Sequence, residues 1–273
     1  MHIIRTPLQL KRLLGKEEGS IGFVPTMGAL HLGHRTLIEQ ARKECKIVVV
    51  SIFVNPTQFL EGEDLEIYPK KFEADEKICE MSEVDYLFYP DVSDMYGNDE
   101  VRVCAPDIRG YVLEGADRVG HFDGVLTVVM KLLHIVCPDK AYFGKKDAQQ
   151  LSLIEQMVEN LFMDVEIIAV DTVREADGLA MSSRNIYLSD KERQEALKLS
   201  LALKYSAKMV MQGEYHVSTL SQEMHKILDP LHVNYISFVN RKFESITTVE
   251  PQNTIVLVSA TVGTTHLIDN IWI

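Results

Sequence analysis

The chain has 273 residues, of which 46% are hydrophobic and 25% charged, and its formal net charge is −12 at pH 7. This composition is that of a globular protein with one large domain, or a large and a small one. The acidic balance, with no lysine- or arginine-rich block, argues against binding of nucleic acid through the general field, so an anionic ligand would need a local positive cluster.

The first 175 residues or so alternate predicted strands with predicted helices. Thr6-Pro7 is typical of a helix start and predicts a short helix through Leu14. Strands are expected at 21–24, 46–54, 85–88, 140–143 and 165–170, with helices at 35–44, 72–82, 122–136 and from 147 to about 161. The run 46–54 is almost continuously apolar and β-branched, as in a strand buried on both faces. The alternation predicts a mostly parallel, Rossmann-like doubly wound sheet.

The pattern changes after residue 177. Helices are expected at 190–211 and 217–228, followed by strands near 235–239, 254–260 and 266–271. This order is typical of a smaller α+β module. We therefore expect a larger α/β domain at 1–176 and a smaller α+β domain at 177–273.

The cysteines and the hydropathy bear on the compartment. Cys45, Cys79, Cys104 and Cys137 are far apart and form no C-x-x-C pair, which suggests neither a zinc knuckle nor a disulfide scaffold. The first residues lack the apolar core of a signal peptide, and no segment approaches the roughly 18 apolar residues of a membrane span. A soluble, cytoplasmic protein without a membrane partner is expected.

The segment 25–34, Pro-Thr-Met-Gly-Ala-Leu-His-Leu-Gly-His, connects a predicted strand to a predicted helix. Helix N-termini carry unpaired N–H groups and the positive end of the helix dipole, which suits a phosphate. Gly33 lies between His31 and His34 and removes a side chain where a ligand approaches the backbone. A bare H-x-x-H pair is more often a surface turn, but the strand, turn and helix around this one favour an anion site.

Two further polar segments follow predicted strands. Asn55-Pro56-Thr57-Gln58 is either a simple turn or a pair of amides that hydrogen-bond a small hydroxy acid. Gly144-Lys145-Lys146-Asp147 is either an ordinary capped helix start or an anion site, which would explain lysines at the unfavourable end of a helix dipole. In doubly wound sheets such loops meet beyond the carboxyl ends of the strands, so we expect them to line one crevice.

A last polar segment, Met181-Ser182-Ser183-Arg184-Asn185, is by itself commonplace and would usually be a surface loop. Beside the histidine segment it becomes a second phosphate clamp, in which the Arg184 guanidinium matches phosphate oxygens. Carboxylates such as Asp75, Glu63 and Asp64 could assist a metal, although a solvated surface position is the better explanation for each of them. Trp272 is expected to serve packing.

With these residues assembled, the sequence closely resembles the pantoate–β-alanine ligases of the H-x-G-H nucleotidylyl-transferase superfamily, which also contains class I aminoacyl-tRNA synthetases. The resemblance is colinear over almost the whole chain, through 25–34, 53–59, 63–69, 120–124, 142–151 and 174–185. The sequence departs from the family pattern at Leu32, where an acidic residue is frequent, and at Lys145, where glutamate is common. Both departures change local charge without replacing a proposed catalytic atom.

The resemblance implies ATP-dependent condensation of pantoate with β-alanine through a pantoyl-adenylate, with Mg²⁺ and with release of AMP and pyrophosphate. It implies catalytic roles for His31, His34, Lys146, Ser182, Ser183 and Arg184. Implied ATP-binding positions are Pro25, Thr26, Met27, Gly28, His34, Gly144, Lys146, Asp147, Val173, Met181, Ser182, Ser183 and Arg184. Asn55, Gln58 and Gln150 would hold pantoate, and Asp75 is the candidate for help in holding the metal.

The resemblance also implies separate roles for the two domains and a homodimer. Residues 1–176 would bind nucleotide and pantoate, residues 177–273 would act as a lid, and the larger domain would form a homodimer. The apolar run within 125–136 could line the dimer interface or be a buried core helix. Two rival functions are another nucleotidylyl-transferase that stops after nucleotide transfer, and a catalytically idle nucleotide-binding module.

Overall fold

The computed structural model describes residues 1–63 and 65–273 and divides into two compact units. Unit 1 consists of Met1–Lys145 and Gln149–Asp171, and unit 2 consists of Lys146–Ala148 and Thr172–Ile273. Lys146 therefore belongs to unit 2 although its chain neighbours on the N-terminal side belong to unit 1. The functional boundary near residue 176 stays a prediction.

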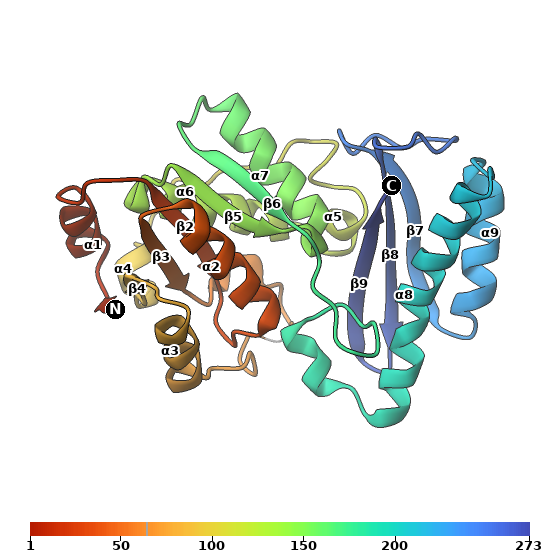
Figure 1. Cartoon of the computed structure of the whole chain (residues 1–273), viewed down its shortest axis with the longest axis horizontal. Coiled ribbons are helices and arrows are strands. Elements are labelled where there is room, and N and C mark those ends of the chain that lie inside the picture. The colour runs from red at the N-terminus through yellow and green to blue at the C-terminus, as the bar shows by residue number, and fades with distance from the viewer. Residues whose placement is uncertain (64) are drawn as a thin grey trace. The chain divides into compact units, whose positions relative to one another are not determined.

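Unit 1 contains a six-stranded sheet whose strand pairs are all parallel (Figure 1). Its strands are β1 (His2–Ile4), β2 (Ile21–Thr26), β3 (Ile47–Ile52), β4 (Tyr86–Phe88), β5 (Lys140–Gly144) and β6 (Glu166–Val170), in the order β1-β4-β3-β2-β5-β6. The predicted doubly wound parallel sheet is confirmed. Its topological switch point lies between β2 and β5, where ligands of such folds bind.

Helices cover the sheet of unit 1. They are α1 (Pro7–Leu14), α2 (Leu32–Glu44), α3 (Phe72–Met81), α4 (Val92–Met95), α5 (Glu114–Asp117), α6 (His121–Val136) and α7 (Ala148–Asn160), with the 3₁₀ turn η1 (Pro56–Gln58). A second 3₁₀ turn, η2 (Lys145–Asp147), precedes α7, and the stretch Lys146–Ala148 at this junction belongs to unit 2. Helix α2 packs on β2, β3 and β5, and α3 lies beside it, while α1 packs on α6. Every residue of β3 is buried, as its β-branched run predicts.

Unit 2 is built on an antiparallel sheet of β7 (His232–Asn240), β8 (Thr254–Val262) and β9 (Thr265–Trp272). Two helices, α8 (Asp190–Met211) and α9 (Val217–Leu228), pack on this sheet and on each other (Figure 1). Ser189 and Glu192 form a capping box that starts α8. Buried leucines of α8 and α9 meet apolar residues of β8 in a core of their own. The expected smaller α+β unit is confirmed.

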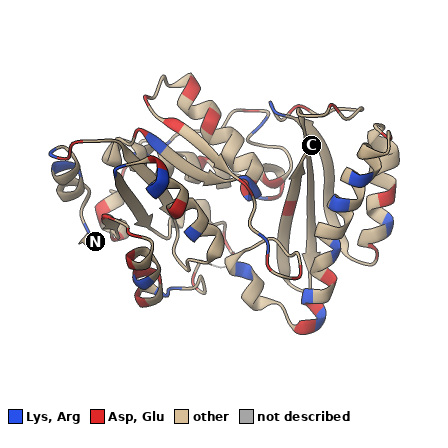
Figure 2. Ribbon diagram, in the orientation of Figure 1, with Lys and Arg blue, Asp and Glu red and all other residues tan. Residues whose placement is uncertain are grey.

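Charged residues of both signs are spread along the helices of both units (Figure 2). Several form surface ion pairs, such as Arg35 with Glu39 on α2 and Lys226 with Glu223 on α9. Within residues 1–63 and 65–273, no helix combines the length and the apolar character that crossing a bilayer requires.

Candidate active site

The turn after β2 is held in a left-handed backbone conformation. Gly28 and Ala29 have φ angles of +87° and +50°, and the conformation is costly for Ala29 because of its Cβ. Thr26 Oγ1 fixes the start of the turn: it donates to the Ser51 carbonyl at 2.7 Å and accepts the Gly28 N–H at 3.2 Å. The turn is thus tied to the end of β3 before the first histidine is reached.

Asp75, from α3, holds the same turn from the other side. Its carboxylate accepts the Ala29 N–H at 2.8 Å and the Leu30 N–H at 2.7 Å, and the residue is 2% exposed. Burial raises the pKa of this carboxyl, although both N–H groups act in the opposite direction. A direct bond from Asp75 to a magnesium ion, as predicted from the sequence, would compete with these two N–H groups.

Two histidines cap the start of α2. His31 is the N-cap: its Nδ1 accepts the Gly33 N–H at 3.2 Å, while His34 Nδ1 accepts the His31 N–H at 3.3 Å. Their ring centroids lie 4.1 Å apart. A ring nitrogen that accepts a hydrogen bond carries no proton, so each neutral imidazole has its N–H at Nε2. The helix start therefore combines two imidazole donors with the positive end of a helix dipole, an arrangement suited to phosphate.

The helix begins earlier than the sequence pattern predicts. It starts at Leu32 rather than after Gly33, so His31 lies at the N-cap and His34 at the third helical position. Leu32, the first helical residue, is 51% exposed. The cap uses imidazole nitrogens where serine, threonine or aspartate is usual, and this is why the ordinary start signals do not locate it.

The segment after β3 places Gln58 beside the turn after β2. Asn55, only 1% exposed, donates from Nδ2 to Gln58 Oε1 and to the Gly124 carbonyl, both at 3.1 Å. Its Oδ1 accepts the Tyr96 hydroxyl at 2.7 Å. Gln58 Nε2 in turn lies 3.1 Å from Met27 Sδ. Asn55 therefore orients Gln58, and the loops after β2 and β3 lie side by side.

The start of α6 lies directly against this segment. A Cβ on Gly124 would come within 2.3 Å of the Thr57 carbonyl oxygen and 2.7 Å of Gln58 Cα. Only glycine permits so close a backbone approach. The segment 120–124, one of those that carry the family resemblance, includes this glycine. The sequence does not indicate which segment α6 approaches.

His121, Arg118 and Glu63 form a chain of contacts that ends at Gln58. His121 Nδ1 donates to the Gln58 carbonyl at 2.7 Å, so its Nε2 accepts from Arg118 at 3.0 Å. Arg118 also binds Glu63 through two hydrogen bonds of 2.6 Å. Burial, followed by the charge of Arg118, lowers the pKa of His121 to about 4. Burial opposes the charged form of Glu63, but the Arg118 and Leu60 N–H groups lower its pKa overall.

These contacts bear on residues that sequence reasoning singled out or missed. Glu63, considered for a metal, is engaged by Arg118, and Asp64 lies outside the described residues. His121 and Arg118 were not predicted as site residues, because an isolated histidine and arginine before a helix carry no specific signal.

Gln150 and Gly144 are the remaining predicted site residues of unit 1. Gln150 is half-buried near the start of α7, whereas its neighbour Gln149 is buried and donates to the carbonyls of Arg109 and Val112. Gly144 ends β5, and a Cβ there would meet no described atom within 4 Å. The adjacent glutamines thus differ in environment, and Gln149 is the one that holds the 109–112 loop.

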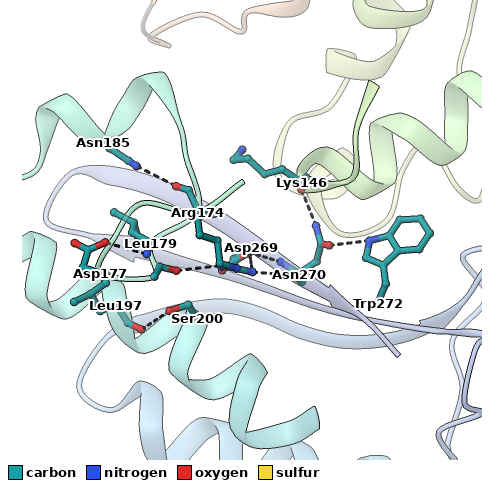
Figure 3. A network of polar contacts seen from close by, with 12 residues as sticks. Lys146, Arg174, Asp177, Leu179, Asn185, Leu197, Ser200, Asp269, Asn270 and Trp272 are labelled. Carbon is teal, nitrogen blue, oxygen red and sulfur yellow. Dashed lines mark hydrogen bonds and ion pairs between the residues drawn. The ribbon is translucent and has the colours of Figure 1, made fainter. Parts of the chain in front are cut away.

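Lys146 and Asp147 are held within unit 2. Lys146 Nζ lies 3.0 Å from Asp147 Oδ1, and Asn270 Nδ2 donates to the Lys146 carbonyl at 2.7 Å. Asn270 Oδ1 accepts the indole N–H of Trp272 at 2.9 Å (Figure 3). Trp272, expected to serve packing, thus orients a buried amide, and the Arg241 guanidinium also lies over its ring.

The serine–arginine segment is also built into unit 2. Ser182 is the N-cap of η3 (Ser183–Tyr187), and its Oγ accepts the Arg184 N–H at 3.2 Å. The Met181 N–H donates to the Val173 carbonyl, which joins two predicted nucleotide-pocket positions. Asn185 donates to the Ala180 carbonyl at 3.0 Å and to Glu175 at 2.7 Å.

The predicted site residues form two groups, one in each unit. Unit 1 holds Pro25, Thr26, Met27, Gly28, His31, His34, Asn55, Gln58, Asp75, Gly144 and Gln150. Unit 2 holds Lys146, Asp147, Val173, Met181, Ser182, Ser183 and Arg184. The first group has imidazoles at the start of α2 and amides at η1 and in α7, and the second has a lysine, hydroxyls and an arginine, which are donors for phosphate oxygens.

Comparisons with known proteins agree on one family. The sequence profile described as Pantoate-beta-alanine ligase matches residues 2–272. The pantothenate synthetase of Sulfurimonas denitrificans is 58% identical over 273 residues, covering 100% of both chains. The crystal structure of a pantothenate synthetase from Thermus thermophilus has a TM-score of 0.95 at 39% identity, covering 100% of this chain and 99% of that one. A pantoate-beta-alanine ligase from Francisella tularensis, complexed with beta-gamma ATP and beta-alanine, has a TM-score of 0.81 at 34% identity, covering 100% and 97%.

Proposed function

The chain belongs to the pantoate–β-alanine ligase family and catalyses ATP-dependent formation of pantothenate, and we propose that the reaction passes through a pantoyl-adenylate. The observation that carries the adenylate step is the paired-imidazole cap of α2, whose Nε2–H donors lie at the positive end of a helix dipole. A group of this kind stabilises charge on a phosphoryl oxygen without adding a formal charge of its own.

In the first step, a pantoate carboxylate oxygen attacks the α-phosphorus of ATP. The new P–O bond forms as the bond to the bridging oxygen breaks, and pyrophosphate leaves with that electron pair. In the second step, the amine of β-alanine attacks the acyl carbonyl, a C–N bond forms, and AMP leaves while the amine loses a proton. Negative charge grows on phosphoryl oxygens in the first step, so donors placed in advance lower its barrier.

Residues of unit 1 are proposed to bind pantoate and part of the nucleotide. Gln58 and Gln150 would donate and accept hydrogen bonds with the hydroxyl and carboxylate groups of pantoate. The support is that Asn55 fixes the Gln58 amide, with Oε1 and Nε2 in defined directions. The turn 25–28 and Gly144 lie at the switch point of the sheet and are proposed to receive the nucleotide.

Residues of unit 2 are proposed to bind the phosphates and the ribose. Lys146, Ser182, Ser183 and Arg184 would supply donors to the triphosphate, and Asp147 would accept from the ribose. Val173 and Met181 would line the nucleotide pocket. We further propose that residues 177–273 act as a lid that protects the adenylate from water, since an acyl-adenylate hydrolyses readily.

Magnesium is proposed to bind chiefly through the phosphates of ATP. Because the phosphates supply ligands, the ion needs only one or two carboxylates from the protein. The carboxylates named from the sequence are already engaged, Asp75 by two backbone N–H groups and Glu63 by Arg118. When bound, the ion would neutralise phosphate charge. The protein groups proposed to bind the phosphates directly are the two imidazoles, Lys146 and Arg184.

Location and assembly are also proposals. A cytoplasmic protein is supported by four free thiols. We propose a homodimer through unit 1. Most residues of the apolar run 125–136 are buried in α6, which favours the core-helix interpretation of this run. Exposed apolar side chains between β4 and α6, namely Val101, Ile108 and Val119, are better placed for the dimer interface. Light scattering on the purified chain measures the mass directly.

The adenylate step is tested by isotope exchange. ATP and pantoate without β-alanine should exchange labelled pyrophosphate into ATP, and exchange should stop when pantoate is omitted. AMP should accumulate only when β-alanine is also present. A preparation that forms pantothenate but shows no exchange would exclude a freely reversible adenylate. A nucleotidylyl-transferase that stops after nucleotide transfer would instead form no AMP, and a binding module would consume no ATP.

A further inference from the structure

Two adjacent residues of β9 hold two separate loops of unit 2. Asp269 binds Arg174 through two hydrogen bonds of 2.6 and 3.0 Å, and Asn270 donates to the Lys146 carbonyl at 2.7 Å (Figure 3). Both β9 residues are almost fully buried, at 4% and 3% exposure. Neighbouring residues of a strand point to opposite faces, so one strand can reach a loop on each side.

The direction of the Asn270 amide is settled by its neighbours. The indole N–H of Trp272 can only donate, so the atom of Asn270 that it meets at 2.9 Å is the oxygen. The other end of the amide is therefore the NH₂ group, and it faces the Lys146 carbonyl, which can only accept. Each polar atom thus has its complementary partner, and the reversed orientation of this amide would satisfy neither.

Arg174 connects β9 to the turn that precedes the serine–arginine segment. Besides Asp269, it donates to the Gly178 and Asn270 carbonyls at 3.2 and 3.3 Å. Arg174 and Ala180 form a β-bridge, and Ala180 accepts from Asn185 just beyond the segment 182–184. The path from β9 to the serines thus runs through the Arg174 side chain, the bridge between residues 174 and 180, and the Asn185 side chain.

We propose that Asn270 is a positioning residue for Lys146, and that β9 fixes the Lys146 backbone relative to the segment 182–184 within unit 2. This inference rests on the proposed catalytic role of Lys146. A lysine ammonium is a point charge on a flexible four-carbon stem, so the position of the Lys146 backbone sets the region that its ammonium group can occupy. Misplacement of a reacting group by about 1 Å can cost on the order of a hundredfold in rate.

The test compares Asn270→Asp with the wild-type chain. The aspartate keeps the size of the side chain and can accept from Trp272, but it presents an oxygen instead of an N–H to the Lys146 carbonyl. The expected result is a fall in kcat of roughly tenfold or more. The apparent KM for pantoate should stay within about twofold, because the proposed pantoate residues lie in unit 1.

A double variant separates positioning from a general loss of structure. If Asn270 acts through Lys146, adding Asn270→Asp to Lys146→Ala should lower kcat no further, because the group to be positioned is already gone. Multiplied losses in the double variant would overturn the proposal, as would normal kcat in folded Asn270→Asp. Near-normal kcat in Lys146→Ala alone would show that Lys146 has no catalytic role. In that case the proposed function of Lys146 would be wrong, which is a different failure from that of the positioning proposal.

The matched control is Thr254→Val in β8. Thr254 is fully buried in the same sheet, and its hydroxyl bonds the Glu250 carbonyl and N–H at 2.9 Å, away from both loops. It should lower the melting temperature and leave kcat unchanged. An equal loss of kcat in this control would reduce the Asn270 effect to stability and overturn the proposal. If Asn270→Asp fails to fold, Trp272→Phe replaces it with the same expected kcat pattern, since phenylalanine keeps an aromatic ring but loses the indole donor to Asn270, together with part of the ring volume.

Discussion

His34 uses its two ring nitrogens for different purposes, and a substitution can separate them. Nδ1 accepts the His31 N–H and completes the cap of α2, whereas Nε2–H is the proposed phosphate donor. In His34→Asn, the amide oxygen can take over the part of Nδ1 and the distal donor is lost. We expect kcat to fall at least about a hundredfold, a loss of roughly 2.7 kcal/mol of transition-state stabilisation.

The stability of the same variant provides the control. His34→Asn should lower the free energy of unfolding by less than about 1 kcal/mol, while His34→Ala loses both the cap and the donor. Steady-state AMP release and urea denaturation measure the two quantities. Near-normal turnover in the folded asparagine variant would remove Nε2–H from the mechanism.

His121 gives the protein a pH-dependent stability that can be isolated. Burial, with the Arg118 charge second, lowers its pKa from 6.5 to about 4. Between these values the unfolded chain binds a proton that the folded chain does not, so the free energy of unfolding falls as the pH falls. This decrease in the free energy of unfolding is absent above about pH 6.5. It is complete below about pH 4, where it amounts to roughly 3 kcal/mol.

The comparison is with His121→Asn, which can still donate to the Gln58 carbonyl but does not titrate. Denaturant unfolding of both proteins between about pH 7 and pH 4 should show the wild-type advantage shrinking by roughly 3 kcal/mol, because other titrating groups cancel in the difference. Parallel stability curves would mean that His121 titrates normally in the folded chain.

At the scale of elements, periodicity predicted the long segments well. The bounds of α8 and α9 agree with the sequence pattern, and the β-branched run of β3 is buried throughout. The pattern missed β1 and α5, since three or four residues are too short for a period to show. It also predicted the polar loops of the site without their support, because contacts such as Asn55 with Gly124 join residues 69 positions apart.

The contact between η1 and α6 gives a prediction at this scale. In Gly124→Ala, the new Cβ would overlap backbone atoms of Thr57 and Gln58, which have no side-chain freedom with which to yield. We expect a loss of roughly 1–3 kcal/mol in the free energy of unfolding. Displacement of Gln58 should also raise the KM for pantoate about tenfold, with a smaller effect on the KM for ATP.

Gly97→Ala is the matched control, since a Cβ there would lie 3.5 Å from Glu100 Oε1, an ordinary contact. Its kinetics and stability should match those of the wild-type chain. A normal KM for pantoate in a folded Gly124→Ala variant would show that the close approach of α6 does not set the position of Gln58.

For the whole molecule, the two units have separate cores. In unit 1, Ile38, Val48 and Tyr142 belong to a buried cluster, whereas Leu203, Leu220 and Val256 belong to that of unit 2. Composition and pattern predicted both units, but not that Lys146–Ala148 belongs with the second, because that follows from contacts such as Asn270 with Lys146, 124 positions away. Separate cores indicate that each unit can lose stability by itself.

The Arg174–Asp269 pair tests this independence. Asp269 has a side-chain exposure of 3%, so Arg174→Met would leave a buried carboxylate without its cation, at a cost of roughly 3–5 kcal/mol. Hydrogen exchange measured by mass spectrometry should accelerate in β7, β8 and β9 and stay unchanged in β2, β3 and β5. Arg193→Met is the control, because Arg193 pairs with the more exposed Glu175 and Asp177, and such pairs contribute about 1 kcal/mol or less. Equal acceleration in both sheets would show that the units unfold as one cooperative body, and no acceleration would show that the buried pair does not stabilise unit 2.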